Sequence, residues 1–201
     1  MLHSTPNDKD SGPVDPVDRA RRCFLKKSTQ VLACVGVACA ITPLVSSLRP
    51  NASTLAAMQP IKVNLKDLAP GQQMIVAWQD QPVLIVRRTH AMLDNLKKNR
   101  TQLRDPDSHV KQQPEYACNT LRSINPEYIV LVGLCTHLGC SPRYEPAVQP
   151  PDWQGGWVCP CHGSRFDLAG RVFKSVPAPI NLLVPDYHFI NEHEIIIGES
   201  A

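Results

Sequence analysis

The sequence CTHLGC occupies positions 135–140, and CPCHGS occupies positions 159–164. Each stretch contains two cysteines and one histidine, so a short part of the chain offers six side chains that bind soft or borderline metals. A structural zinc ion takes four nitrogen or sulfur ligands, fewer than the six on offer. A pair of irons bridged by sulfide needs two protein ligands per iron. The pattern therefore favours an iron-sulfur centre with four protein ligands and two cysteines that are not ligands. A zinc-stabilised binding module is the alternative.

The two stretches, with their glycines and closing serine, resemble the cluster loops of Rieske iron-sulfur subunits from quinol-oxidising cytochrome bc complexes. The likeness covers most of the chain, from Arg21 to about Pro185. It includes the segment 78–89, which is similar to a hairpin of the bacterial subunits. The resemblance implies a mainly β protein, namely an antiparallel β-sandwich Rieske head tethered by one N-terminal transmembrane helix.

The resemblance also implies one Rieske-type 2Fe-2S cluster and assigns its ligands. Cys135 and Cys159 are expected to give thiolates to one iron, and His137 and His162 imidazoles to the other. The Ser164 hydroxyl is expected to donate a hydrogen bond to a sulfide or thiolate. His162 is the position expected to meet quinol, and therefore the catalytic one.

Two cysteines lie outside this ligand set, and one residue departs from the family pattern. The resemblance implies a disulfide between Cys140 and Cys161 that clamps the two loops, which an exported location permits. Mitochondrial-type members have a tyrosine where this chain has Phe166. A tyrosine there is taken to donate a hydrogen bond to a ligand thiolate, and phenylalanine has no such donor.

The function implied is that of an electron carrier within an assembly. The chain is expected to accept one electron from quinol, with coupled proton release, and to pass it to a membrane-anchored cytochrome c, while cytochrome b takes the second electron. A dimeric complex is expected. The surface that docks on cytochrome b is expected at Leu138, Pro177, Ala178 and Pro179.

One alternative keeps the cluster and changes the assembly. The small Rieske subunit of an exported molybdenum oxidase, such as arsenite oxidase, carries the same two loops and can carry an export signal. The proline-containing segment 177–179, the N-terminal anchor and the hairpin argue for the quinol-oxidising complex. The formal net charge of only +3 gives no nucleic-acid footprint, so no nucleic-acid partner is expected.

The N-terminal part divides into three segments. Residues 1–18 are polar and are expected to form a disordered cytoplasmic tail. Residues 19–48 combine a twin-arginine-like signal at Arg21-Arg22 with an apolar run long enough to cross a bilayer. No convincing cleavage site is evident, which favours an uncleaved anchor over a cleaved signal. Residues 49–60 are expected to be a flexible hinge.

Basic residues before the apolar run predict that the N-terminus stays in the cytoplasm. The chain is therefore expected in the bacterial inner membrane as a single-pass protein with its head in the periplasm. Residues 61–201 should form the head, with a cluster subdomain from about 133 to 179. A helix is expected over 91–100. Residues 61–65 alternate and predict a strand, and the apolar runs 73–78 and 82–87 predict a hairpin. Further strands are expected at 128–134, 182–184, 187–190 and 194–197.

Overall fold

The computed structural model describes residues 16–147 and 153–199. It divides into two compact units, Met1–Asn51 and Ala52–Ala201. Most of the tail predicted to be disordered lies outside the described residues. Its last residues belong to helix α1 (Pro16–Ser47), so the helix begins earlier than the predicted boundary at residue 18.

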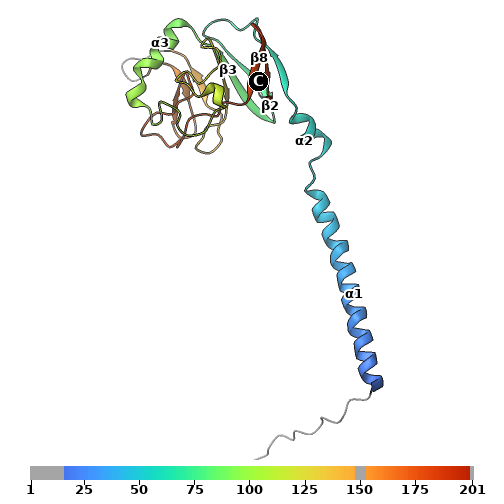
Figure 1. Cartoon of the computed structure of the whole chain (residues 1–201). Coiled ribbons are helices and arrows are strands. Elements are labelled where there is room, and N and C mark those ends of the chain that lie inside the picture. Colours follow the sequence, from blue (N-terminus) through green and yellow to red (C-terminus); the bar gives the residue numbers. More distant parts are fainter. Residues whose placement is uncertain (1–15, 148–152, 200–201) are drawn as a thin grey trace, which may run out of the picture. The chain divides into compact units, whose positions relative to one another are not determined.

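The first unit contains helix α1, which Figure 1 draws in blue. Its 32 residues correspond to about 48 Å at 1.5 Å per residue, more than the ~30 Å of a hydrocarbon core. None of its residues is buried in the protein. Within the described part of the chain, this is the one helix long and apolar enough to span a membrane. Thr29 and Thr42 hydroxyls donate to carbonyls four residues earlier, so these polar groups are satisfied within the helix.

The segment predicted as a hinge contains a short helix, α2 (Ala52–Ala57). Non-helical residues flank it on both sides. After it, the carbonyl of Gln59 accepts a hydrogen bond from the indole of Trp78 at 3.2 Å. The chain is therefore fixed to the head from about Gln59 onward. The freedom of residues 49–58 stays a prediction.

The head is built from three small antiparallel sheets. The first has the order β1-β9-β8, and the second has the order β2-β3-β4. The third, β5-β6-β7, carries the second motif stretch between its last two strands. The strands are β1 (Ile61–Asn64), β2 (Gln73–Trp78), β3 (Gln81–Arg87), β4 (Tyr128–Val132), β5 (Arg143–Glu145), β6 (Gly156–Val158), β7 (Arg165–Asp167), β8 (Tyr187–Asn191) and β9 (Glu194–Ile197).

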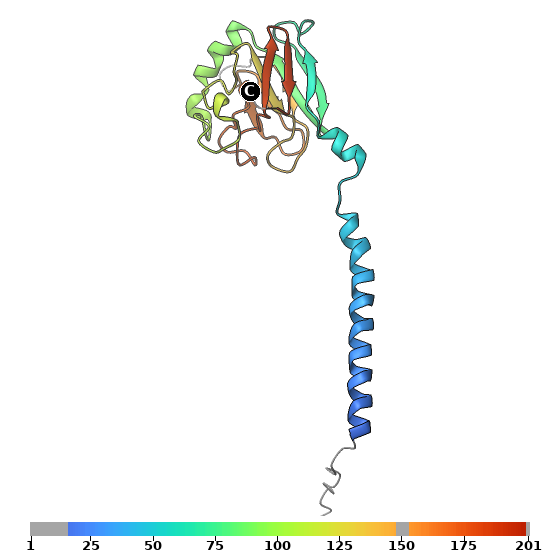
Figure 2. The same ribbon diagram turned by 45° about the vertical axis from the view of Figure 1, so that its right-hand side comes forward.

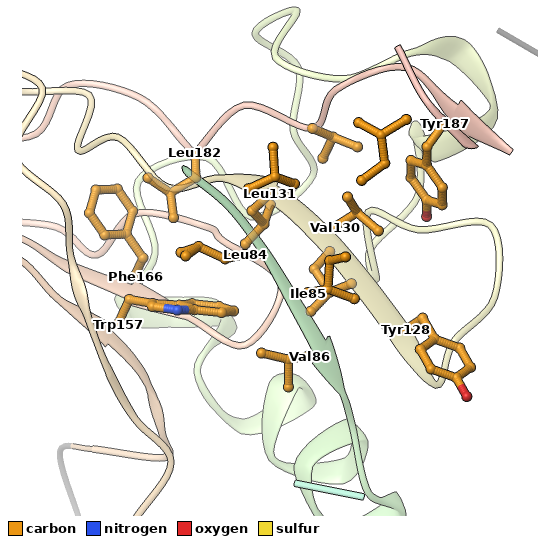
Figure 3. Close-up of a cluster of buried hydrophobic side chains, with 14 of the residues drawn as sticks. Leu84, Ile85, Val86, Tyr128, Val130, Leu131, Trp157, Phe166, Leu182 and Tyr187 are labelled. Carbon is orange, nitrogen blue, oxygen red and sulfur yellow. The ribbon is translucent and has the colours of Figure 1, made fainter. Parts of the chain in front are cut away.

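The first two sheets share one core. Figures 1 and 2 show β8 beside β2 and β3, and buried residues of both sheets belong to one apolar cluster. In Figure 3, Leu84, Leu131 and Leu182 lie near Trp157 and Phe166, which come from the third sheet. The predicted antiparallel sandwich is confirmed, and its core continues without a break into the part that carries the motifs.

Helix α3 (His90–Lys98) matches the predicted helix to within two residues. The Thr89 side chain caps it by accepting a hydrogen bond from the Met92 N–H at 3.3 Å. Its buried residue Leu96 packs against Leu168 and Ala169. Two short 3-10 helices, η1 (Arg100–Gln102) and η2 (Glu115–Ala117), follow along the chain.

One predicted strand is wrong. Residues 182–184 have the apolar composition of a strand, but their backbone groups bond to three different segments. Leu182 donates to the Gly170 carbonyl, Val184 donates to the Gln112 carbonyl, and the Leu183 carbonyl accepts from Val132. Leu182 and Val184 are apolar because they are buried between segments, whereas Leu183 is exposed, and no single neighbouring segment pairs with all three as a strand would. Strand β5, conversely, was not among the predicted strands.

Candidate metal centre

The two motif stretches, called loop 1 (135–140) and loop 2 (159–164), have the same backbone frame. In each loop the carbonyl of the first cysteine accepts from the glycine four residues on, at 2.8 Å for Gly139 and 2.9 Å for Gly163. The N–H of the first cysteine donates to the carbonyl five residues on, at 2.8 Å in loop 1 and 2.7 Å in loop 2. Both glycines have positive φ, +79° and +71°, which favours glycine in these turns.

The first cysteines of the loops, Cys135 and Cys159, are each only 2% exposed. The two histidines lie further out. The His137 and His162 ring centroids are 4.8 Å apart with the rings nearly perpendicular. His162 is exposed and His137 is half-buried. The structure therefore has both thiols buried, the His137 ring half-buried and the His162 ring exposed.

A single buried polar atom shows that this arrangement fits a metal. Among side-chain nitrogen and oxygen atoms of the described residues, His137 Nδ1 is the one that is buried without a hydrogen-bond partner. Burial of an unpaired polar group costs free energy of about 1–3 kcal/mol. A ring nitrogen that binds iron would remove that cost, so the donor set fits an iron-sulfur cluster held by Cys135, Cys159, His137 and His162.

Burial affects the protonation of Cys135. Desolvation raises the pKa of its thiol, and the neighbouring Cys159 adds to this rise. Hydrogen bonds from the backbone N–H of His137 and from the Ser164 hydroxyl oppose it. These two donors therefore favour the thiolate form that a metal ion would require.

A disulfide joins Cys140 of loop 1 to Cys161 of loop 2, across 21 positions of sequence. This is the pairing that the resemblance implied. The sulfurs of Cys140, Cys159 and Cys161 all lie within 4.8 Å of one another. Because two of these sulfurs are bonded to each other, they are not available as ligands, and the disulfide lies directly beside the Cys159 thiol.

A third segment, residues 177–180, is tied to both loops. The Thr136 hydroxyl donates to the Ile180 carbonyl at 2.6 Å. The Ser164 hydroxyl oxygen accepts from the Ala178 N–H at 3.0 Å, which leaves its own hydrogen free to donate toward a ligand sulfur. Thr136 was not among the predicted site residues. Its one signal is a hydroxyl next to a ligand cysteine, which a sequence alone does not distinguish from a surface threonine.

Of the four residues predicted to form the docking surface, three are exposed and one is buried. The side chain of Leu138 is 71% exposed, and Pro177 and Pro179 are exposed as well. Ala178 is 0% exposed, so it contributes no side chain to this surface. The segment turns its middle residue inward because its N–H bonds to the buried Ser164. The outer surface therefore consists of Leu138 and the two prolines.

Paired loops with two buried thiols, two outer imidazoles and a disulfide bridge define a Rieske-type iron-sulfur domain. A comparison with protein families agrees, since the Rieske [2Fe-2S] domain matches residues 60–187. A second family, the TAT signal of the ubiquinol-cytochrome c reductase Fe-S subunit, matches residues 14–51.

Relatives with curated names place the chain more narrowly. The ubiquinol-cytochrome c reductase iron-sulfur subunit of Allochromatium vinosum is 48% identical over 188 residues, which is 92% of this chain and 91% of the relative. The subunit of the same name from Bradyrhizobium diazoefficiens is 38% identical, covering 89% and 94% of the two chains. The chain belongs to the family of Rieske iron-sulfur subunits of ubiquinol-cytochrome c reductase.

Among solved structures, a chain of a hyperthermophilic respiratory Complex III aligns with 86% of this chain and 99% of its own length. Its sequence identity is 21% and its TM-score is 0.45.

Proposed function

We propose that this subunit accepts one electron from quinol and passes it to a membrane-anchored cytochrome c, while cytochrome b takes the second electron. The bound 2Fe-2S cluster supplies a one-electron acceptor whose two imidazole ligands raise its potential above that of all-cysteine clusters. The observation that carries the proposal is the position of His162. It is exposed next to the half-buried His137, so a ring nitrogen can reach a hydroxyl outside the protein.

The residues around His162 suit a proton-coupled transfer. A histidine that binds metal through one ring nitrogen keeps a second nitrogen that can hold or lose a proton. The His162 ring is expected to accept a hydrogen bond from the quinol hydroxyl and then its proton. Leu138, exposed on loop 1, supplies an apolar contact beside it, which suits docking against cytochrome b.

The arrangement in the membrane is also proposed. We place α1 across the bacterial inner membrane, with the N-terminus in the cytoplasm and the head in the periplasm, as a subunit of a dimeric complex. Basic residues at the start of the helix and the disulfide support this orientation. Replacing both Arg21 and Arg22 by lysine should keep the charge and block export by the twin-arginine route. Protease added to spheroplasts should then no longer reach the head.

Electron paramagnetic resonance of reduced membranes tests the function directly. We expect a Rieske-type signal that changes shape when an inhibitor occupies the quinol site, because the inhibitor contacts the His162 ring. Purification should recover cytochrome b with the chain. A signal that no quinol-site inhibitor alters, together with a molybdopterin subunit in the purified complex, would favour the molybdenum oxidase alternative.

A further inference from the structure

Three arginines are buried behind loop 2. Arg88 and Arg171 are each 2% exposed, and Arg122 is 0% exposed. Asp167, also 0% exposed, is the carboxylate that pairs with one of them. Three guanidinium groups and one carboxylate leave a net charge of +2 in this group. Arginines are seldom fully buried unless they are paired, so this excess of positive charge is unusual for a protein interior.

Arg171 is paired with a carboxylate. Its Nη2 and Nε lie 2.6 Å and 2.8 Å from Asp167 Oδ2. Asp167 Oδ1 accepts from the N–H groups of Ala169 and Arg171, both at 2.9 Å. The carboxylate is therefore fully bonded within its own turn and has little capacity left for the other two arginines.

Arg88 and Arg122 are held mainly by backbone carbonyls. Arg88 donates to the Leu168 carbonyl at 3.2 Å, and Arg122 donates to the Ala169 carbonyl at 3.0 Å. No ion pair joins either of them to a carboxylate in residues 16–147 and 153–199. Their other partners are Leu121, Ser123, Pro126 and Tyr128 for Arg88, and Gln112, Gln113 and Leu182 for Arg122.

Both arginines stay charged at neutral pH. Burial lowers the pKa of Arg88 to about 10, although Tyr187 and Asp167 oppose the shift. Burial likewise lowers the pKa of Arg122 to about 10, opposed by Asp167 and, less strongly, by the half-buried Asp105. Carbonyl dipoles solvate the charges but do not neutralise them, so their field reaches further than that of an ion pair.

Two of the carbonyls that bind these arginines, those of Leu168 and Ala169, lie four and five residues after the end of loop 2. Strand β7 starts one residue after Ser164 and ends at Asp167. At about 3.3 Å per residue, the Asp167 backbone lies within about 10 Å of the Ser164 backbone. Gly170 completes the turn with a φ of +71°, and a Cβ on it would approach Leu131 to 2.8 Å and Arg122 Nη1 to 3.1 Å. The absence of a side chain at Gly170 therefore leaves room for the Arg122 guanidinium against the turn that follows loop 2.

We propose that Arg88 and Arg122 raise the midpoint potential of the centre, because their positive charges, which no ion pair neutralises among the described residues, favour the added electron. Electron uptake makes the centre more negative, and net charge is one of the levers that set iron-sulfur potentials. The proposal rests on the electron-accepting role given above. It concerns the potential alone, which is measured without quinol, so it can fail while the proposed function stands.

The test uses the full chain in membranes or in the purified complex, with the signal of the reduced cluster followed through a redox titration. Arg122→Gln removes the charge and keeps an amide donor for one carbonyl. Arg122→Lys keeps the charge and loses the planar fork of donors. Arg104→Gln is the matched control, because Arg104 is exposed and also bonds a carbonyl, that of Val176, at 3.1 Å.

We expect Arg122→Gln to weaken one-electron uptake about tenfold, a fall of about 59 mV in midpoint potential. Arg122→Lys and Arg104→Gln should each move it by less than a third of that. Asp167→Asn, which removes a negative charge and keeps an acceptor at Oδ1, should move the potential upward. These opposite signs separate an effect of charge from simple loosening of the turn, which has no reason to depend on the sign of the charge removed.

Equal falls for Arg122→Gln and Arg122→Lys, or a fall for Asp167→Asn, would overturn the proposal. Arg88→Gln and Arg88→Lys provide the same comparison if Arg122→Gln assembles no cluster. If every neutralised variant lacks the signal while the lysine variants keep it, the charge serves folding, and the proposal is overturned as well.

Discussion

Loop 1 and loop 2 share a backbone frame but differ in how their histidines are placed. In loop 1 the histidine is two residues after the ligand cysteine, and its Nδ1 is buried. In loop 2 the histidine is three residues after, and it is exposed. In loop 2 the residue two after the first cysteine is instead Cys161, which is bonded to Cys140, the last residue of loop 1. The same loop backbone therefore presents two kinds of imidazole: the half-buried ring of His137 and the exposed ring of His162, which a partner can contact.

Cys135 and Cys159 occupy the same place in the two loops, and their replacement should have the largest effect on the cluster. Cys135→Ser and Cys159→Ser should each abolish the Rieske signal of reduced membranes, because each removes one of two thiolates in the same position of the frame. Cys118→Ser is the control, since Cys118 is an exposed free cysteine outside both loops. A variant of one loop that kept a full signal would show that the two inner positions are not equivalent ligands.

The disulfide joins the two loops, and its loss should have the next largest effect, on the stability of the head. A bridge across 21 positions removes about 3 kcal/mol of chain entropy from the unfolded state. Cys140→Ser, Cys161→Ser and the double variant should therefore lose similar stability, seen as earlier loss of the cluster absorbance on heating. A double variant clearly worse than either single one would mean that the sulfurs contribute separately.

Ser164 of loop 2 and Thr136 of loop 1 both bond to segment 177–180. Comparing variants of these two residues separates the loss of an anchoring hydrogen bond from the loss of a hydrogen bond to a ligand sulfur. Ser164→Ala loses a hydroxyl that can donate to a ligand sulfur, while Thr136→Val loses only a bond to the Ile180 carbonyl. A hydrogen bond to a charged group contributes about 1.5–3 kcal/mol.

Ser164→Ala should therefore lower the midpoint potential by about 60 mV or more, at 59 mV per tenfold change. Thr136→Val should leave the potential nearly unchanged and cost about 1 kcal/mol of stability. Redox titration and thermal melting of the two variants decide this. Equal shifts in potential would mean that both hydroxyls act by positioning the loops.

The sequence predicted the parts of this site that metal chemistry makes unusual. Four ligands and a cysteine pair at fixed spacing have few other uses, and the structure brings them together. The strands of the sandwich were also predictable, β9 from its alternating burial, and β3 and β4 as short apolar runs that are buried on both faces. Residues 182–184 were not, since apolar composition reports burial and does not say which neighbour accepts the hydrogen bonds.

The charged interior was invisible to sequence analysis for a physical reason. An arginine in a sequence is expected at the surface. Arg88, Arg122 and Arg171 are buried because turns distant in sequence direct their carbonyls at the same place, as when Arg88 bonds the Leu168 carbonyl 80 positions away. No local pattern records such a convergence. The inward turn of Ala178 is similar, because it depends on a bond to Ser164.

The smallest expected effect concerns Phe166, which follows loop 2 and has no counterpart after loop 1. It is 0% exposed and belongs to the same apolar cluster as Cys135 and Cys159. It pairs with Trp157 across strands β6 and β7. Phe166→Tyr adds a hydroxyl where the mitochondrial-type pattern has one. A hydrogen bond to a ligand thiolate worth about 1.4 kcal/mol would raise the midpoint potential by about 60 mV.

The matched control is Phe189→Tyr, which makes the same change at a half-buried position of β8, in a different sheet. It should leave the potential where it was. Redox titration of both variants beside the unmodified protein checks the prediction. An unchanged or lower potential for Phe166→Tyr would mean that the added hydroxyl does not reach a ligand sulfur. Ser164 would then be the last residue after Cys159 whose side chain affects the potential.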